Sequence, residues 1–406
     1  MDELEALRGM RTNLAVEESP ERLGLRTNWR AETPERRLRS RSSWRLPVIG
    51  VATAAAVAAG TVAVVAVNSD GGGSATPGKS GTPPTVALGG GNALLVAATN
   101  AEKAPAGAYW HTRRIMGEIN DVGKSRADYY RVDSRQGMES WTDAAGKQRG
   151  FHLDFGGRPL GPQDDQKWRA AGSPKEVKAP NPDGDGPAII FMGEQPSRTP
   201  WPPDDKVRYY GLTVKQIAAL PTTPQGLQNA LLDVKDHWRA VSPEDGHKEP
   251  MRNVHGSERV RALSEVAGAL LSEAPAPPKV RAAAFRMLAS LPGIKAEGTA
   301  ADPLGRTGTV ISLPLATTTQ LGLHTSPMQL GTYRRQWIID PAHGRLLAVR
   351  DLTATPPHGH GPYTTRDSGA RTRLEVDDMP DRFHKRGDLA GYVVYEVAEW
   401  TNAGPR

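Results

Sequence analysis

The sequence predicts an α+β protein with a short cytoplasmic tail, one transmembrane helix, and an extracytoplasmic domain in which helices pack on a curved antiparallel sheet. Two observations carry this prediction. Residues 47–67 form one long uncharged apolar run. Beyond a first short helix that reaches residue 103, strand-like segments come first, helical segments follow, and strand-like segments return. Strands and helices that are segregated along a chain are typical of α+β folds.

The run at residues 47–67 reads PVIGVATAAAVAAGTVAVVAV. As a helix rising about 1.5 Å per residue, it is roughly 31 Å long, close to the ~30 Å hydrocarbon thickness of a bilayer. A cleaved signal peptide and a buried core helix are the alternatives, but apolar regions of signal peptides usually run only about 7–15 residues. We expect the lipid bilayer to contact the proline at its start and its branched side chains, namely Pro47, Ile49, Val57, Val62, Val65 and Val67.

The flanks of this run predict its orientation. No acid occurs within residues 36–46, and a glycine-rich segment follows the run. Basic residues remain on the cytoplasmic side of a span. We therefore expect a single-pass protein of the cell membrane, with residues 1–46 in the cytoplasm. The residues that set this topology are Arg36, Arg37, Arg39, Arg41 and Arg45.

Residues 1–46 are too short and polar to form a domain with its own core. Leu4, Leu7 and Leu14 share one helical face, which predicts either a marginal surface helix or a helix that docks on a cytoplasmic regulatory partner. Residues 68–87 are rich in Gly, Ser, Thr and Pro, so we expect a flexible linker with a reach of about 25 Å. Residues 88–406 then form the extracytoplasmic domain.

The first part of this domain begins with a helix and continues as strands. Asn92 is the expected N-cap of a helix reaching residue 103, with Leu94, Leu95 and Ala98 facing inward. Alternating apolar and aromatic residues predict strands at 109–119, 129–132, 139–143 and 150–155, with a turn at 144–147. The Gly-, Pro- and Asp-rich residues 156–187 predict a long loop before a brief strand at 189–192.

Helices follow in the middle of the domain. Thr213 is the expected cap of a helix over 214–220, Pro224 begins a second that reaches residue 238, and Ser257 caps a third. The third has an apolar face of Val260, Leu263, Ala267, Leu270 and Leu271. Pro278 begins a fourth helix, which ends at Pro292-Gly293.

Strands are expected again near the C-terminus. One strand is expected at 309–313 and another at 392–400. Between them, strands at 337–340 and 345–349 form a hairpin across 341–344, and a polar loop region follows at 353–388.

Composition and motifs exclude several functions. The chain has no cysteine, which excludes disulfides, a thiol nucleophile and cysteine zinc sites. The net charge of +6 comes without a basic run interleaved with aromatics outside the membrane flank, so no nucleic-acid partner is expected. Nucleophile-elbow, H-E-x-x-H and G-x-G-x-x-G patterns are missing from the sequence. We therefore predict no enzyme activity, catalytic residue, cofactor or metal. The sequence does not specify an oligomeric state.

Three clusters resemble sites without completing them. His358 and His360 can meet one metal but lack a rigid third ligand, so solvated loop histidines are favoured for them and for His343 and His384. Asn181, Asp183 and Asp185 match the first ligands of a calcium loop. The twelfth position of such a loop must be a bidentate Glu, and this chain has Met192 there, so we favour an acidic turn. The third cluster is Glu139, Trp141 and Asp143. These residues can line a pocket, but we favour a packed Trp141 whose neighbours face water.

Ordered motifs along the chain carry a family resemblance. They include Ile217-Ala-Ala-Leu-Pro-Thr222, Leu270-Leu-Ser-Glu-Ala-Pro275, Leu288-Ala-Ser-Leu-Pro-Gly293, Asp302-Pro-Leu-Gly-Arg306 and Ile339-Asp340-Pro341 with Gly344-Arg345-Leu346-Leu347. With these, the chain resembles actinobacterial single-pass membrane proteins of uncharacterised function, often encoded beside a sigma factor. The resemblance implies an exterior domain without an assigned active site and a link to surface-stress signalling.

Three functions follow as hypotheses. The first is a membrane protein whose exterior domain senses or binds something at the cell surface, associated with sigma-factor regulation through residues 1–46. The alternative is a carrier, similar to lipid or lipoprotein carriers, that binds a hydrophobic ligand in the concavity of the sheet. The third is a hydrolase, for which a convergent polar pocket is required.

Overall fold

A computed structural model of the chain describes residues 90–182, 186–193, 197–234, 250–317, 330–365 and 371–405. All of them belong to one structural unit, which begins at Gly81. The predicted span at 47–67, its flanking arginines, the cytoplasmic segment and the linker lie outside the described residues. Among the helices that are described, none has the length and apolar character needed to cross a membrane.

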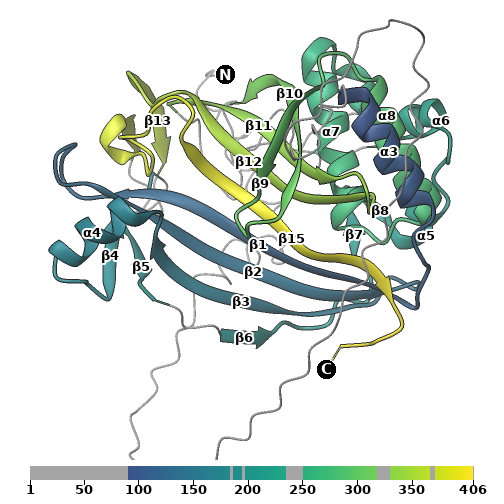
Figure 1. Ribbon diagram of the computed structural model, residues 1–406, viewed down its shortest axis with the longest axis horizontal. Coiled ribbons are helices and arrows are strands. Elements are labelled where there is room, and N and C mark those ends of the chain that lie inside the picture. Colours follow the sequence, from purple (N-terminus) through teal and green to yellow (C-terminus); the bar gives the residue numbers. More distant parts are fainter. Residues whose placement is uncertain are drawn as a thin grey trace, which may run out of the picture. The chain divides into compact units, whose positions relative to one another are not determined.

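The described residues form an antiparallel sheet of nine strands, and helices accompany it, so the α+β class is confirmed. Figure 1 shows the long central strands arcing across the molecule. The first strand and the last strand of the sheet are neighbours at its centre, where Tyr109 pairs with Thr401. In spatial order the strands are β6 (Ser197–Pro200), β3 (Gln148–Pro159), β2 (Tyr130–Asp143), β1 (Tyr109–Val122), β15 (Leu389–Thr401), β12 (Arg345–Thr355), β11 (Thr332–Asp340), β10 (Thr307–Thr317) and β9 (Lys295–Ala301).

Five helices gather on one side of this sheet (Figure 1), namely α3 (Gly90–Glu102), α5 (Val214–Ala218), α6 (Pro224–Leu232), α7 (Gly256–Ser272) and α8 (Pro278–Ser290). A smaller group lies at the other end of β2 and β3: α4 (Pro162–Ala170), β4 (Glu176–Ala179) and β5 (Ala188–Phe191). The short elements are β7 (Arg208–Tyr209), β8 (Leu212–Thr213), β13 (His360–Thr365), β14 (Arg371–Glu375), and the 3-10 helices η1 (Met251–Asn253) and η2 (Val376–Asp378).

The main core lies between the helices and the sheet. The predicted apolar face of α7 is buried there, together with Phe285 and Leu288 of α8. From the sheet, Trp337 and Ile339 of β11 join the same cluster. Each buried aliphatic or aromatic side chain contributes about 1.5–3 kcal/mol relative to exposure. This apolar contact is what holds the helical layer on the sheet.

Two tryptophans fasten the central strands to the α7–α8 connection. Trp110 of β1 donates its indole N–H to the carbonyl of Glu273 at 3.0 Å, and Trp400 of β15 donates to the carbonyl of Ala276 at 3.2 Å. Their rings meet edge to face with centroids 5.6 Å apart. Carbonyls at the end of a helix need partners when they are buried. These two bonds supply partners at the point where the chain turns from α7 into α8.

Buried and half-buried ion pairs also join α7 to the sheet. Arg335 of β11 contacts Asp351 of β12 at 2.9 Å and Glu265 of α7 at 2.7 Å. Arg114 of β1 contacts Glu273, at the end of α7, at 2.6 Å. A buried charge is costly unless it is paired, so these contacts restrict how α7 can sit on the strands. The space between helices and sheet is therefore filled by apolar side chains and ion pairs.

Local helix and turn signals were confirmed where they depend on a few adjacent residues. Thr213 caps α5 in a capping box with Gln216. Pro224 and Pro278 are the first residues of α6 and α8. The hairpin across 341–344 forms between β11 and β12, with Gly344 at a φ of +61°.

Other local predictions were wrong. Asn92 is not a cap because α3 begins at Gly90, and α7 begins at Gly256, with His255 rather than Ser257 in the N-cap position. Leu95 is 47% exposed because the buried stripe of α3 passes through Leu94 and then Ala97 and Ala98. The chain leaves α6 at Leu232, well before the predicted residue 238.

Two regions predicted as loops contain ordered elements. The 156–187 region includes α4 and β4, and 353–388 includes β13, β14 and η2. Val177 and Ala179 of β4 pack with Ile190 of β5 and Val132 of β2, so partners distant in sequence bury these short segments. The expected strand at 189–192 is β5, shifted by one residue to Ala188–Phe191.

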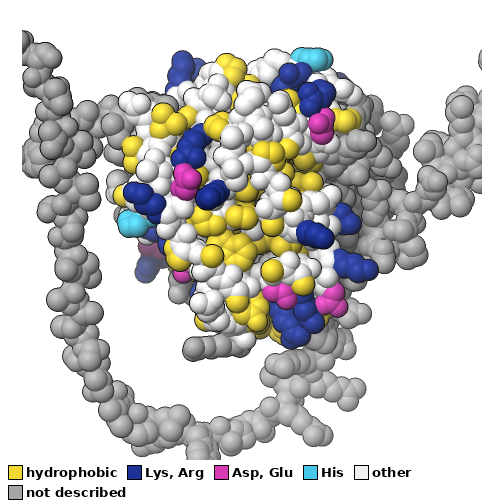
Figure 2. Space-filling model, turned by 90° about the vertical axis from the view of Figure 1, so that its right-hand side faces the viewer, with side chains coloured by type: hydrophobic (Ala, Val, Ile, Leu, Met, Phe, Trp, Pro, Cys, Tyr) yellow, Lys and Arg dark blue, Asp and Glu magenta, His cyan; other side chains and the backbone are white. Residues whose placement is uncertain are grey.

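The outer side of the helical layer is partly apolar. Figure 2 views the molecule from the side where α3, α6 and α8 lie and shows hydrophobic side chains gathered near the middle, with Lys and Arg around them. Leu95 and Val96 of α3 are exposed by 47% and 40%. More than half of the accessible surface of a folded protein is typically apolar, so we draw no site from these residues.

Gly344 is a position where the fold requires glycine. A Cβ there would lie 2.3 Å from the backbone nitrogen of Ala101 in α3, and its φ of +61° is left-handed. We expect Gly344→Ala to lower the free energy of unfolding by about 3 kcal/mol, because conformational strain and a backbone clash add. Gly359→Ala is the matched control, since Gly359 has a φ of +69° but no atom within 4 Å of a Cβ. Its cost should be only about 1 kcal/mol. Denaturant unfolding of both variants measures the difference, and equal costs would contradict the role of the α3 contact.

Candidate functional site

The face of the sheet opposite the helices carries a cluster of charged and aromatic side chains. On β2, Ser140 and Thr142 face the helical side, where Thr142 contacts Tyr209. Glu139 and Trp141 alternate with them and therefore point to the other face. Antiparallel pairing places His111 of β1 opposite Trp141, and Phe151 of β3 opposite Glu139. Three adjacent strands thus present one surface.

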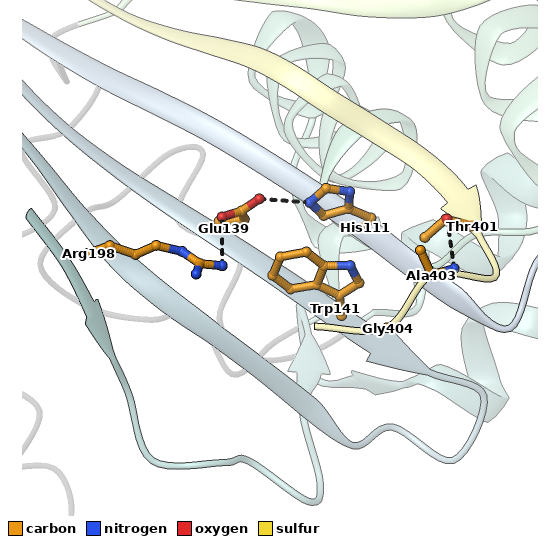
Figure 3. A pocket seen from close by; sticks show the side chains of 7 residues that line it. All are labelled: His111, Glu139, Trp141, Arg198, Thr401, Ala403 and Gly404. Atoms are coloured by element: carbon orange, nitrogen blue, oxygen red, sulfur yellow. Dashed lines mark hydrogen bonds and ion pairs between the residues drawn. The ribbon is translucent and has the colours of Figure 1, made fainter. Parts of the chain in front are cut away.

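The centre of this surface is the carboxylate of Glu139 (Figure 3). His111 Nε2 lies 3.1 Å from Glu139 Oε1, and Arg198 of β6 donates to Oε2 at 3.3 Å. Glu139 is only 9% exposed although it carries a charge. Hydrogen bonds to charged groups are among the stronger ones, so two donors hold this carboxylate in one orientation.

Aromatic rings support the polar groups from both sides. The His111 ring stacks on Trp141 with centroids 4.2 Å apart and an angle of 9° between planes. The Arg198 guanidinium lies 3.4 Å from the centroid of Phe151, and Phe151 meets Trp141 edge to face at 6.3 Å. Cation–π contact and stacking restrict the rotamers of the imidazole and the guanidinium. The cluster is therefore held rigidly before any ligand arrives.

Two pockets lie on either side of Trp141. The first, of about 270 Å³, is lined by His111, Glu139, Trp141 and Arg198 together with Thr401, Ala403 and Gly404 of the C-terminal segment. The second, of about 320 Å³, is lined by Tyr109, Trp141, Asp143, Lys147, Arg149 and Pro405. Because they share Trp141 and adjoining C-terminal residues, we call the two together the Trp141 groove.

Asp143 has a structural role within this groove. Its Oδ1 accepts hydrogen bonds from the backbone nitrogens of Ala145 and Lys147, both at 2.9 Å. Side-chain-to-backbone bonds of this kind fix a turn. Gly146 lies in that turn with a φ of +88°. The predicted turn at 144–147 is thus confirmed, and Asp143 orients it.

The expectation that Trp141 is packed was confirmed, but the expectation that the residues beside it face water was wrong. Trp141 is buried, but so is Glu139, and Ser140 and Thr142 are buried on the helical side. Side chains of the neighbouring strands, His111 of β1, Phe151 of β3 and Arg198 of β6, cover Glu139, which alternation along one strand cannot reveal. The sequence did not indicate His111 or Arg198, because strand pairing between distant segments brings them to Glu139.

The other sequence clusters do not converge on the groove. His358 and His343 lie at exposed positions, where they contact the Pro356 carbonyl and Asp340. His384 is the exception, since it is only 1% exposed, so the prediction of a solvated histidine was wrong for it. Asp183 and Asp185 lie outside the described residues. Within the described ranges, no group of three or more His, Asp or Glu side chains has an arrangement that holds a metal.

Comparisons with protein-family models, with curated proteins and with solved structures find no match to this chain. The geometry of the groove and the sequence patterns are therefore the basis on which its function is inferred.

Proposed function

We propose that the chain is a single-pass membrane protein whose exterior domain binds a polar ligand in the Trp141 groove. In this proposal residues 47–67 cross the bilayer and residues 1–46 contact a cytoplasmic partner of the sigma-factor pathway. The apolar run and its arginine flank support the topology. The held carboxylate of Glu139 beside two pockets is the observation that supports a binding role.

The lining of the groove favours a glycan, a neutral or weakly charged sugar chain, as the ligand class. Its side chains provide both acceptors and donors: a carboxylate at Glu139, a guanidinium at Arg149 and an ammonium at Lys147. The aromatic rings of Tyr109 and Trp141 lie among them. Sugars present C–H faces to aromatic rings and hydroxyls that both donate and accept. The groove holds both signs of charge, with two acids and three arginine or lysine side chains beside His111, so it suits a ligand that both donates and accepts hydrogen bonds.

The alternative of a carrier for hydrophobic ligands has less support. Such a carrier needs apolar space between the sheet and the helices. That space holds packed side chains such as Trp337 and Phe285, and the ion pairs of Arg335. The two pockets described above lie on the opposite face.

A hydrolase also has less support. The pair His111–Glu139 resembles a base with its orienting acid, but such a pair acts on a nucleophile within hydrogen-bond reach. Thr401 supplies a hydroxyl to the first pocket, where its oxygen accepts from the backbone nitrogen of Ala403 at 3.1 Å, whereas the hydrogen bond of His111 Nε2 goes to Glu139. The contacts of the described groove residues therefore favour binding over catalysis.

The topology is tested with protease on intact cells and spheroplasts that carry the full chain. We expect external protease to digest residues 88–406 and to spare an epitope placed within residues 1–46. The protein should fractionate with membranes until detergent is added. Protection of the C-terminal part, or recovery in the soluble fraction without detergent, would contradict the proposed orientation.

The cytoplasmic link is tested by copurification. The full chain should copurify with the sigma factor encoded beside it, and deletion of residues 2–30 should abolish this. Deletion of residues 71–80, in the predicted linker, is the control and should leave it intact. No copurification with the full chain, or retention after the N-terminal deletion, would reject the link.

Ligand binding is tested with the purified full chain and oligosaccharides of N-acetylglucosamine as probes. We expect Glu139→Gln to weaken calorimetric affinity about tenfold, because it removes the charge that holds His111 and Arg198. Glu297→Gln is the matched control. Glu297 also pairs with an arginine, Arg334 at 3.2 Å, but on the opposite edge strand β9, so affinity should be unchanged. Absent binding, or equal effects of both substitutions, would overturn the glycan proposal.

A further inference from the structure

A polar segment is buried where the chain enters the last strand. Residues 379–388, which we call the docked loop, join η2 to β15. Pro380 accepts a hydrogen bond from the backbone nitrogen of Asp121 in β1, and Phe383 donates its backbone N–H to Asp121 Oδ2, both at 2.6 Å. Tyr333 of β11 donates to Asp381 at 2.7 Å. The docked loop is thus attached to two strands through carboxylates.

Two atoms in this region face each other without an ordinary hydrogen bond. Asp121 Oδ1 lies 3.7 Å from His384 Nε2, and both side chains are fully buried. Among the described residues neither atom has a hydrogen-bond partner. Buried polar atoms are nearly always hydrogen-bonded, because leaving one unsatisfied costs about 1–3 kcal/mol. The separation is short enough for a small side-chain adjustment to let one proton bridge the two atoms.

Charged groups surround the pair from several elements. Asp121 faces Asp381 and Arg382 of the docked loop and Arg131 of β2. His384 faces Asp388 of its own loop, and its Nδ1 lies 3.5 Å from the hydroxyl of Thr353 in β12. Further charged and titratable groups interact electrostatically with one of these, namely Tyr129, Asp164, Asp377 and Asp128. Arg131 is itself 3.3 Å from Asp388 and 3.9 Å from Asp164.

Burial moves the two titrations in opposite directions. It raises the pKa of Asp121 from 3.8 to about 7, and the negative charge of Asp381 adds to that increase. Burial lowers the pKa of His384 from 6.5 to about 4, although Asp388 opposes the decrease. Desolvation disfavours the charged form of either group. Between these two pKa values the carboxyl of Asp121 is protonated and the imidazole of His384 is neutral.

We propose that Asp121 and His384 act as a buried carboxyl–imidazole pair that carries one proton between them, fastens the docked loop to β1, and makes a contribution to the stability of the domain that is nearly independent of pH from mildly acidic to neutral conditions. The proposal is independent of the ligand of the Trp141 groove, because these residues lie at the opposite end of β1 from His111.

The sign of each contribution follows from proton linkage. Asp121 has a raised pKa, so the stability it contributes is fully present below about pH 4 and is lost as the pH rises towards 7. His384 has a lowered pKa, so its contribution is present above about pH 6.5 and is lost as the pH falls towards 4. The folded pair and the unfolded pair each hold about one proton across this range. The two slopes therefore cancel in the natural protein.

The experiment compares the full chain with Asp121→Asn, His384→Gln and the double variant, unfolded in denaturant between pH 4.5 and 6.5. The double variant serves as the reference, because subtracting it removes other titrations such as that of Glu118, whose pKa burial raises to about 7. In Asp121→Asn only His384 still titrates, so relative to this reference the unfolding equilibrium constant should fall up to about tenfold for each pH unit of increase. In His384→Gln only Asp121 still titrates, so the same constant should rise up to about tenfold for each pH unit of increase. It should stay nearly flat in the natural chain. Equal pH dependence in all four proteins would overturn the proposal.

A second measurement covers the case in which a variant does not fold. Nuclear magnetic resonance of ring-labelled histidine in the natural chain reports the protonation of His384 directly. We expect the imidazole to remain neutral down to about pH 4. Titration of His384 near its ordinary value of 6.5 would overturn the proposal.

Discussion

The pairing of β1 with β15 is the contact on which the rest of this structure depends. It joins the first and last strands of the sheet at its centre, across most of the described chain. Closing so long a loop costs conformational entropy, which local contacts cannot offset. The compensation comes from side chains that these strands bury together. Trp110 and Trp400 touch each other, and both donate to backbone carbonyls of the α7–α8 connection.

The same pairing gives the sheet two chemically different faces. Successive residues of β1 point alternately to the helices and away from them. Trp110 and Arg114 therefore meet α7 and the α7–α8 connection, whereas Tyr109 and His111 meet the Trp141 groove. The helical side uses its residues for packing and ion pairs. The opposite side leaves a carboxylate, an imidazole and a guanidinium beside open space, which is why we assign binding to it.

Strand β1 also connects the two regions for which we make proposals. His111 is near its start, in the groove, and Asp121 is near its end, against the docked loop. In both regions a carboxylate is buried by partners from other strands or loops. In the groove the carboxylate is held by two basic side chains at its rim. Under the docked loop the opposing group is an imidazole, and burial rather than ion pairing decides where the proton resides.

The sequence by itself determined the features that act over a few residues. The proline starts of α6 and α8, the Thr213 cap and the turn at Gly344 are set by backbone geometry within one turn of the chain. The apolar run at 47–67 and its flank likewise predict a span that remains a prediction. Only the tertiary structure decided that Glu139 meets His111 and Arg198, and that His384 is buried against Asp121. Those contacts depend on strand register and loop docking, which arise from the summed burial of distant side chains, and no local pattern encodes them.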